Sequence, residues 1–232
     1  MPIARRYRLA AGLARLFPAL GRWAAARRRF RVFSEIFQTN FWGSPTSVSG
    51  PGSELGQTAM IREAIPALLA AHGVGSILDA PCGDFNWMQH VPLTGIHYTG
   101  VDIVPALIAR NRASYGSADR TFVLGDIVEG ALPTADLIFC RDCLVHLSYD
   151  ETRRALDNFR RSGATWLLTT TFTSTRANHD IVTGDWRPIM LQQAPYGFPE
   201  PVALINEGCT EFDGRYPDKS LGLWRLADLP TW

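Results

Sequence analysis

The chain has 232 residues, of which 46% are hydrophobic and 19% charged, and its net charge is +1. This length suffices for one α/β domain with a full core plus an accessory segment, and the composition excludes a disordered or fibrous protein. The small net charge conceals an asymmetry: residues 1–31 contain nine Arg and no acid, whereas the remainder has 14 basic and 22 acidic residues. An acidic body disfavours a nucleic-acid channel, so we expect no nucleic-acid partner.

The basic stretch at residues 1–31 has the pattern of a helix. Its apolar residues follow the i, i+3, i+4, i+7 spacing of one helix face: Leu13, Leu16, Phe17, Leu20 and Ala24. Arg15 and Arg22 interrupt the apolar stretch, which is too short and too charged to span a bilayer. We predict a helical arm that packs on the domain or lies in solvent. Contact with the inner face of a membrane is the alternative.

Predicted helices and strands alternate from residue 57 onward. The strands are expected at 76–80, 97–102, 121–124, 136–140, 166–171, 202–206 and 220–226, and the helices at 56–71, 105–114 and 150–161. We divide the chain into an arm and lid segment, residues 1–56, and a domain, residues 57–232. The pattern predicts an α/β fold: a Rossmann-like three-layer sandwich with a mostly parallel seven-stranded sheet, an antiparallel edge hairpin and an N-terminal helical arm.

The most informative stretch follows the first predicted strand. This strand ends in Asp79, and a tight turn with Pro81 and Gly83 leads into a predicted helical segment that holds Trp87 and Met88. A strand, a turn and a helix N-terminus gather unpaired backbone N–H groups at one point, which attracts a carboxylate or phosphate. An acid at the strand end can also hold an amine or a hydroxyl group.

Two further acids end the next strands. Asp102 ends the second strand and Asp126 follows the third, and the carboxyl ends of parallel strands meet at the ligand-binding edge of such sheets. Asp102 is suited to accept two hydrogen bonds from a ribose diol. Asp126 is placed to receive the exocyclic amine of an adenine, with Ile127 packing on the ring. The alternative for each acid is a solvated loop residue or a helix cap.

These residues resemble the first motifs of the class I S-adenosylmethionine-dependent methyltransferases. The resemblance covers roughly residues 57–172, although Pro81 and Phe85 stand where glycines are usual. With the segments 141–146 and 218–224, it points to a bacterial subgroup of uncertain substrate. It implies S-adenosylmethionine as cofactor, with its methionyl part near Asp79 and Gly83. The predicted cofactor-binding residues are Asp79, Pro81, Cys82, Gly83, Asp84, Asp102, Ile103, Asp126, Ile127, Ser49 and Gly50.

The rival to this interpretation is a nicotinamide-dependent reductase. Such enzymes have a GxGxxG motif at the start of the first helix, and the sequence lacks this motif. The only lysine, Lys219, also has no Tyr-x-x-x-Lys pattern around it.

Because these glycines are absent, we predict that other residues bind the methionyl part of the cofactor. We expect Asp84 to bind its ammonium group, and the loop at 47–53 to offer donors to its carboxylate. This loop would fold over the cofactor as a lid, with Phe41 and Trp42 excluding water. A plain linker is the alternative.

The acceptor side of the site is expected after the fourth strand, at residues 141–146. In the resembled family this region borders the transferring methyl group. Asp142 and His146 are four residues apart, so we expect them on one helical face. Because His has a suitable pKa for deprotonating a hydroxyl, we predict His146 as base and Asp142 or Arg141 as its orienting partner. Alternatively, His146 caps a turn or packs beside the cofactor.

The long segment after the fifth strand is rich in polar and aromatic residues, and long loops in compact domains are often functional. The predicted substrate-binding residues are Arg176, Asn178, Trp186 and Arg187. Trp186 and Tyr196 are expected to stack on a sugar or aromatic ring. The alternative is a structural excursion held by internal hydrogen bonds.

The spacing of the four cysteines does not indicate a metal site. Cys140 and Cys143 form a CxxC, but neither a second pair nor a neighbouring His pair completes a set of ligands. We expect small apolar core residues in a reduced, cytoplasmic protein.

Together these patterns predict an S-adenosylmethionine-dependent methyltransferase that modifies oxygen in a small molecule or a sugar or glycan. The basic arm adds the expectation of peripheral contact with the inner membrane face. The alternatives are a non-catalytic S-adenosylmethionine-fold binding or scaffold protein, and a methyltransferase acting on a protein or nitrogen acceptor.

Overall fold

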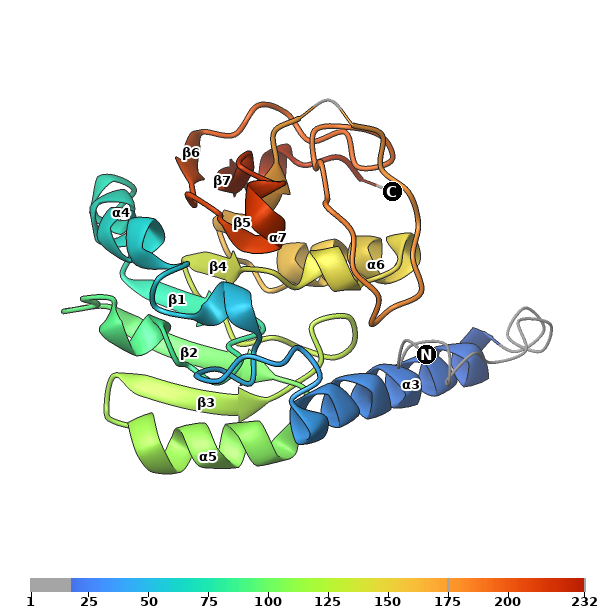
Figure 1. The fold of residues 1–232 in the computed structure, drawn as a ribbon, viewed down its shortest axis with the longest axis horizontal. Helices are drawn as coiled ribbons and strands as arrows, with labels where there is room; N and C mark the ends of the chain where they lie inside the picture. Colours follow the sequence, from blue (N-terminus) through green and yellow to red (C-terminus); the bar gives the residue numbers. More distant parts are fainter. Residues whose placement is uncertain (1–17, 175, 232) are drawn as a thin grey trace.

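A seven-stranded sheet forms the centre of the computed structural model, which describes residues 18–174 and 176–231 (Figure 1). The strand order is β3-β2-β1-β4-β5-β7-β6. The strands are β1 (Ser76–Asp79), β2 (His97–Asp102), β3 (Arg120–Leu124), β4 (Leu137–Cys140), β5 (Trp166–Phe172), β6 (Ala203–Asn206) and β7 (Lys219–Arg225). Strands β1 to β5 pair in parallel, whereas β7 runs antiparallel to both β5 and β6. The predicted sheet with its antiparallel edge is therefore confirmed.

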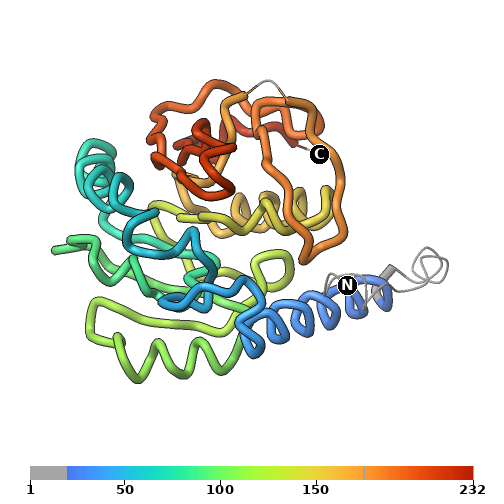
Figure 2. The backbone as a smooth tube through the Cα atoms, in the orientation of Figure 1, coloured from blue at the N-terminus to red at the C-terminus, as the bar shows by residue number. Residues whose placement is uncertain are grey.

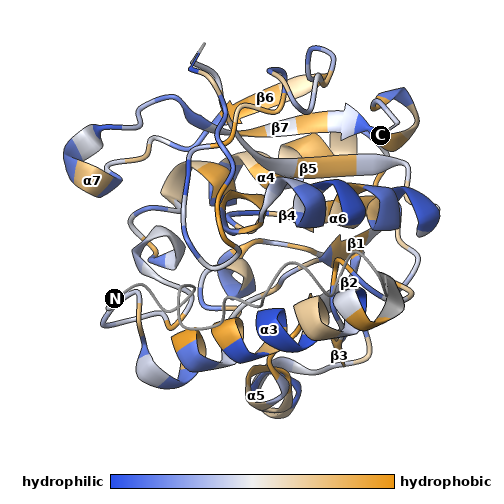
Figure 3. Cartoon of the chain, turned by 90° about the vertical axis from the view of Figure 1, so that its right-hand side faces the viewer, coloured by the Kyte–Doolittle hydropathy of each residue, from blue (hydrophilic) through white to orange (hydrophobic). Residues whose placement is uncertain are grey.

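Helices cover both faces of the sheet, because successive strand residues point to opposite sides. Leu78 of β1 belongs to the core cluster of Phe159 in α6 (Tyr149–Arg161). Its neighbour Ile77 belongs to the cluster of Ile65 in α4 (Ala59–Ala71), which also includes Ile108 of α5 (Pro105–Tyr115). The outward side of α6 is hydrophilic (Figure 3). This arrangement confirms the predicted three-layer sandwich.

The predicted arm is helical over the part that the structure describes, as α3 (Pro18–Thr39). The apolar pattern at Leu13, Leu16 and Phe17 lies outside the described residues. One side of α3 is buried against the domain through Arg29, Val32 and Ile36. Leu20, Trp23 and Phe30 are exposed on other positions of the helix.

The helix expected after β1 is replaced by turns and a three-residue 3-10 helix at Met88–His90, so this prediction is wrong. Gly83 and Phe85 have φ angles of 53° and 59°. Left-handed residues cannot continue a right-handed helix, so the chain turns here. The Phe85 ring is buried and lies 5.0 Å from the Tyr98 ring and 5.3 Å from the Phe122 ring. The backbone N–H groups near the cofactor motif therefore belong to a turn.

The chain between β5 and β6 is long and irregular, and Figure 2 shows it in orange. It is followed, between β6 and β7, by the short α7 (Glu211–Gly214), in which Phe212 and Asp213 have left-handed φ angles. These connections approach the carboxyl ends of β4 and β5. They supply much of the wall of the site described next.

Candidate active site

One cavity of about 700 Å³ lies at the carboxyl ends of the parallel strands, where α/β sheets bind ligands. Asp79, Asp102 and Asp126 all line it. Residues 141–143 and His146 also line it, and α3 and residues 48–53 contribute further wall. A volume of this size falls within the roughly 300–1,000 Å³ of ligand pockets.

Asp79 is a buried acid at the end of β1. The Tyr98 hydroxyl donates a hydrogen bond to one of its carboxylate oxygens. Burial raises the pKa of Asp79 to about 8, although the Tyr98 hydrogen bond acts in the opposite direction. A cationic group beside this carboxylate would favour its ionised form.

Asp102 organises the backbone around the first turn. Its two carboxylate oxygens accept hydrogen bonds from the N–H groups of Val104, at 2.9 Å, and Gly83, at 3.2 Å. A carboxylate can accept about four hydrogen bonds, so acceptor capacity remains for a ribose hydroxyl. Burial raises the pKa of Asp102 to about 6, against the effect of these N–H donors. Pro81, Cys82 and Ile103 line the same part of the cavity.

Asp126 lines the cavity but already has a partner in α3. Arg29 Nε lies 3.2 and 3.1 Å from its two oxygens, and an Arg29 Nη donates to one of them at 2.5 Å. The N–H of Val128 donates to the other at 2.9 Å. An adenine amine at Asp126 would have to compete with Arg29, and the predicted adenine contact stays a prediction. Ile127 is buried in the adjoining wall.

Asp84 holds the loop before α4 instead of presenting a free carboxylate. One oxygen accepts from the Ser47 hydroxyl at 2.8 Å and from the Val48 N–H at 2.9 Å, and the other accepts from the Asn86 N–H. Asp84 thus anchors the loop and also lines the cavity, and its predicted contact with the cofactor ammonium stays a prediction. Ser49 accepts a hydrogen bond from the Asp84 N–H, and both Ser49 and Gly50 line the cavity.

His146 is held by a backbone carbonyl. Its Nδ1 lies 2.9 Å from the oxygen of Asp185. Because a carbonyl can only accept, Nδ1 carries the proton and Nε2 is the basic nitrogen. The Trp42 ring lies 5.1 Å from the imidazole. Burial lowers the pKa of His146, so the ring is neutral near pH 7.

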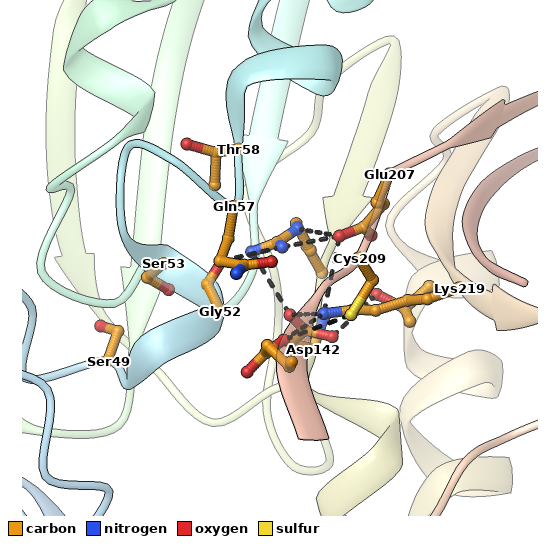
Figure 4. A network of polar contacts seen from close by, with 12 residues as sticks. Ser49, Gly52, Ser53, Gln57, Thr58, Asp142, Glu207, Cys209 and Lys219 are labelled. Carbon is orange, nitrogen blue, oxygen red and sulfur yellow. Dashed lines mark hydrogen bonds and ion pairs between the residues drawn. The ribbon is translucent and has the colours of Figure 1, made fainter. Parts of the chain in front are cut away.

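The predicted orienting partners of His146 are wrong. Asp142 has a left-handed φ of 51° and precedes the 3-10 helix Leu144–His146, so the two residues do not share a helical face. Both Arg141 and Asp142 belong to a separate network of ion pairs, shown in Figure 4.

This network joins β4 to the chain around β7. Arg141 donates to Glu207 at 2.6 Å, and Lys219 lies 3.2 Å from Glu211. Lys219 also lies 2.7 Å from Asp142 (Figure 4). Burial raises the pKa of Asp142, but Lys219 and Arg141 outweigh it and lower that pKa to about 2. Arg141 also donates to the carbonyl of Gly52 at 2.9 Å, which ties the lid loop to the acceptor side.

Only Trp186 among the four predicted substrate-binding residues lines the cavity. Asn178 hydrogen-bonds the backbone of Met190 and Ala194, and thus fixes its own loop. Arg187 is fully buried, and it donates to the Leu147 carbonyl and the Tyr196 hydroxyl.

Arg176 is exposed, with its guanidinium 5.3 Å from the Tyr216 ring. The substrate roles predicted for Asn178 and Arg187, and the stacking role of Tyr196, are therefore corrected to structural ones.

Several cavity residues are not predicted from the sequence. These are Arg29, Phe33, Phe172, Glu211, Phe212, Tyr216 and, as a site residue, Lys219. Most are distant in sequence from any strand end of the parallel sheet, so spacing gave no signal for them. The single lysine of the chain was the one visible hint.

The four cysteines are buried free thiols. Within residues 18–174 and 176–231, His, Cys, Asp and Glu side chains form no group of three or more suited to a metal ion. In the same part of the chain, none of the helices has the length and apolar character needed to traverse a bilayer.

A known family model matches the segment of the chain that contains most of β1 and strands β2 to β4. Residues 77–164, less than half of the chain, match a family model described as a methyltransferase domain. No curated protein sequence matches the chain.

Three of the solved structures that match the chain are methyltransferases. The methyltransferase domain of bacterial CtHen1-CN matches with a TM-score of 0.52 and 12% identity, over 74% of this chain and 100% of that chain. The N-methyltransferase NodS from Bradyrhizobium japonicum WM9, in complex with S-adenosyl-L-homocysteine, has a TM-score of 0.48, 16% identity and coverage of 59% and 72%. Magnesium protoporphyrin IX methyltransferase (ChlM) from Synechocystis PCC 6803 has a TM-score of 0.41 and 17% identity. That match covers 50% of this chain and 56% of the ChlM chain.

The sheet order, with antiparallel β7 between β5 and β6, agrees with the sequence match. Residues 77–164 therefore belong to a methyltransferase domain.

Proposed function

We propose that this protein methylates a hydroxyl group of a small molecule or a sugar or glycan, with His146 as general base. The observation that carries the proposal is the hydrogen bond between His146 Nδ1 and the Asp185 carbonyl, at 2.9 Å. It leaves Nε2 unprotonated on a neutral ring that lines the cavity. A hydroxyl acceptor needs a base of this kind.

The residues at the strand ends fit the cofactor. Asp102 retains acceptor positions for a ribose diol, and Asp79 offers a buried carboxylate to the methionyl ammonium. Ser49 and Gly50 of the lid loop line the same cavity, and their N–H groups donate to Ser47 within the loop. When bound, S-adenosylmethionine supplies a methyl group activated by its sulfonium. The protein then mainly needs to position the acceptor and remove its proton.

Charges of both signs act on His146. Lys219 and Arg187 lower its pKa, whereas the Asp142 carboxylate, kept ionised by Lys219 and Arg141, raises it and so stabilises the imidazolium that forms. Burial acts in the opposite direction and keeps the free ring neutral. This balance suits a base that works near neutral pH.

Aromatic side chains offer a surface for the body of the acceptor. Phe172, Trp186, Phe212 and Tyr216 line the cavity, and the Trp186 ring lies 5.2 Å from the Phe212 ring and 5.1 Å from that of Tyr216. Such a wall suits a flat aromatic ring or the apolar face of a sugar. This supports a ring-bearing acceptor over a flexible protein chain.

A matched pair of histidine variants tests the role of the base. His146→Ala should lower turnover by about 100-fold or more while cofactor affinity, measured by calorimetry, stays the same. His179, an exposed histidine of the long loop, gives the control His179→Ala with full turnover. Unchanged turnover in His146→Ala would remove it as base.

The acceptor is sought with methyl-labelled S-adenosylmethionine against phenols, methyl glycosides and matched amines. Methyl ether products support the proposal, whereas methylated amines would replace it with the nitrogen-acceptor alternative. Absence of cofactor binding at millimolar concentration would favour the non-catalytic scaffold.

Peripheral contact with an anionic membrane surface is proposed for α3. Three apolar side chains on this helix are exposed, Leu20, Trp23 and Phe30, and the Arg27 guanidinium lies over the Trp23 ring. Exposed apolar and aromatic residues next to arginines, with no acid before Glu35, match an interfacial helix. The same helix lines the cavity through Arg29 and Phe33, so membrane contact would place the site near the surface.

A further inference from the structure

Arg29 joins two walls of the site from a single buried position. Only 1% of its surface is exposed, and its guanidinium contacts two carboxylates from different elements. It pairs with Asp126 after β3 at 2.5 Å and with Glu151 in the first turn of α6 at 2.6 Å. The planar guanidinium can bridge two carboxylates in this way, whereas an ammonium cannot reproduce the geometry.

Glu151 extends this contact into the acceptor side. It is buried, and its second oxygen accepts a hydrogen bond from the Thr183 hydroxyl. Thr183 is fully buried and accepts in turn from the Ser148 N–H at 2.9 Å, next to the start of α6. Both oxygens of Glu151 are therefore used, one toward α3 and one toward the long loop after β5.

The residues after Thr183 hold the proposed base. The Gly184 N–H donates to the His146 carbonyl at 2.8 Å, and the Asp185 carbonyl binds His146 Nδ1 at 2.9 Å. Thus His146 is fixed at its backbone and its ring by two residues that directly follow Thr183. In Figure 1 this orange loop passes below α6 toward α3, in agreement with these contacts.

From this chain of contacts we infer that Arg29 and Thr183 are positioning residues: through Glu151, they hold the turn at 183–185 that sets the tautomer and orientation of His146. The inference rests on the proposed function of His146 as base. It makes α3 part of the active site. It also ties the wall of the cofactor side, at Asp126, to the base on the acceptor side.

Removing one hydrogen bond from this chain of contacts should leave the His146 ring free to reorient, while every cavity residue is retained. In Thr183→Val the Glu151 carboxylate loses its hydroxyl donor, and the turn is free to shift. A misplacement near 1 Å can lower turnover by about 100-fold, so we expect a 10- to 100-fold loss. Cofactor affinity should be unchanged, because the Arg29–Asp126 pair is intact. Thr183→Ser keeps the hydroxyl and should behave as the original protein.

Nitrogen NMR of the full-length, ¹⁵N-histidine-labelled protein reads the tautomer directly. His146→Gln identifies the His146 signal among the five histidines. We expect the Nδ1–H tautomer in the original protein and in Thr183→Ser, and a mixture with Nε2–H in Thr183→Val. Arg29→Lys, which keeps one charge, should shift the signal in the same direction, while Arg27→Lys on the exposed side of α3 should not.

The tautomer signal separates this inference from the proposed function. If the signal is unchanged in folded Thr183→Val, or shifts equally in Thr183→Ser, the positioning role is overturned. If the signal shifts as expected while His146→Ala keeps full turnover, the positioning role stands and the role of base fails.

Discussion

The carboxylate of Asp84 binds the Ser47 hydroxyl at 2.8 Å, across 37 positions of the sequence. The same oxygen also accepts the Val48 N–H, and Ser49 accepts the N–H of Asp84. A Cβ on Gly83 would lie only 2.4 Å from the Ser49 hydroxyl oxygen. The lid loop therefore lies directly on the turn that follows β1, and glycine at 83 allows this close approach.

Removing the Asp84 anchor should open the lid. In Asp84→Ala the Ser47 and Val48 donors lose a charged acceptor, and each such bond contributes about 1.5–3 kcal/mol. We expect faster protease cleavage within residues 44–53 and weaker binding of S-adenosylmethionine. Asp136→Ala is the matched control, because Asp136 also accepts from a serine hydroxyl and an N–H, beside the start of β1. Equal effects of both variants on cofactor affinity would contradict the anchoring role.

Cofactor affinity should depend on pH through Asp79. With a pKa of about 8, Asp79 is protonated in the free protein at pH 7 and must lose its proton to pair with the methionyl ammonium. Affinity should therefore rise as the pH increases toward 8. It should fall again above 8, where the free α-amino group, with a pKa of about 8, loses its own proton. Calorimetry from pH 6 to 9.5 measures this curve.

Asp79→Asn provides the control for the pH dependence. Its affinity should be lower near pH 8, and the rise between pH 7 and 8 should disappear, because asparagine does not titrate. A variant that retains the full rise would assign it to another group, with Asp102, whose pKa is about 6, as the next candidate.

At position 85 the glycine variant should be more stable than the alanine variant, which reverses the usual order. Its φ of 59° is unfavourable for any side chain by about 1–2 kcal/mol, yet its ring is buried among Tyr98, Tyr115 and Phe122. Phe85→Ala loses the ring and keeps the strain, at a cost of about 3–5 kcal/mol for the ring alone. Phe85→Gly loses the ring but relieves the strain, so it should be about 1 kcal/mol more stable than Phe85→Ala.

Denaturant unfolding of four variants checks this order. Phe122 lies within strand β3, where glycine is less favourable than alanine. Phe122→Gly should therefore be less stable than Phe122→Ala by about 0.5–1 kcal/mol. The same order at both positions would show that backbone strain at Phe85 contributes little.

The strands were predictable from the sequence because short apolar runs end in acids or turn residues. Asp79 and Asp102 are an example: each ends its strand, and both line the cavity. The turn that stands in place of the expected helix after β1 was not predictable. A buried aromatic ring at position 85 compensates for the left-handed backbone there, and that compensation depends on Tyr98 and Phe122 from other strands.

Side-chain partners were the least predictable part of the site. The pairing of Arg29 with Asp126 joins residues 97 positions apart, and that of Lys219 with Asp142 spans 77 positions. Periodicity reports which face of an element is buried, but it carries no information about such partners. Asp142 and His146 illustrate the error, because a four-residue spacing was interpreted as helical where the chain makes a left-handed turn.

Lys219 should be essential to the stability of the acceptor wall. Lys219→Met would remove the cation that pairs with Glu211 and leave Asp142 with Arg141 at 3.3 Å, and breaking a buried pair costs about 3–5 kcal/mol. Adding Asp142→Asn should restore part of this loss.

Because the pKa of Asp142 is lowered to about 2, its contribution to stability is present above pH 4 and is lost as the pH falls toward 2. Denaturant unfolding between pH 2.5 and 7 should show this dependence in the original protein and a weaker one in Lys219→Met.

Membrane contact through α3 is tested by vesicle flotation. Leu20 and Trp23 are 62% and 59% exposed, so their apolar surface is available to a bilayer. We expect binding to vesicles containing phosphatidylglycerol, with about 1 kcal/mol contributed per arginine near the surface, and loss of that binding at high salt. Leu20→Ser with Trp23→Ser should abolish it. Val202→Ser with Leu204→Ser, at positions 54% and 48% exposed in and beside β6, should leave it unchanged. Equal binding of both double variants, or binding that is independent of anionic lipid, would show that α3 does not form the contact.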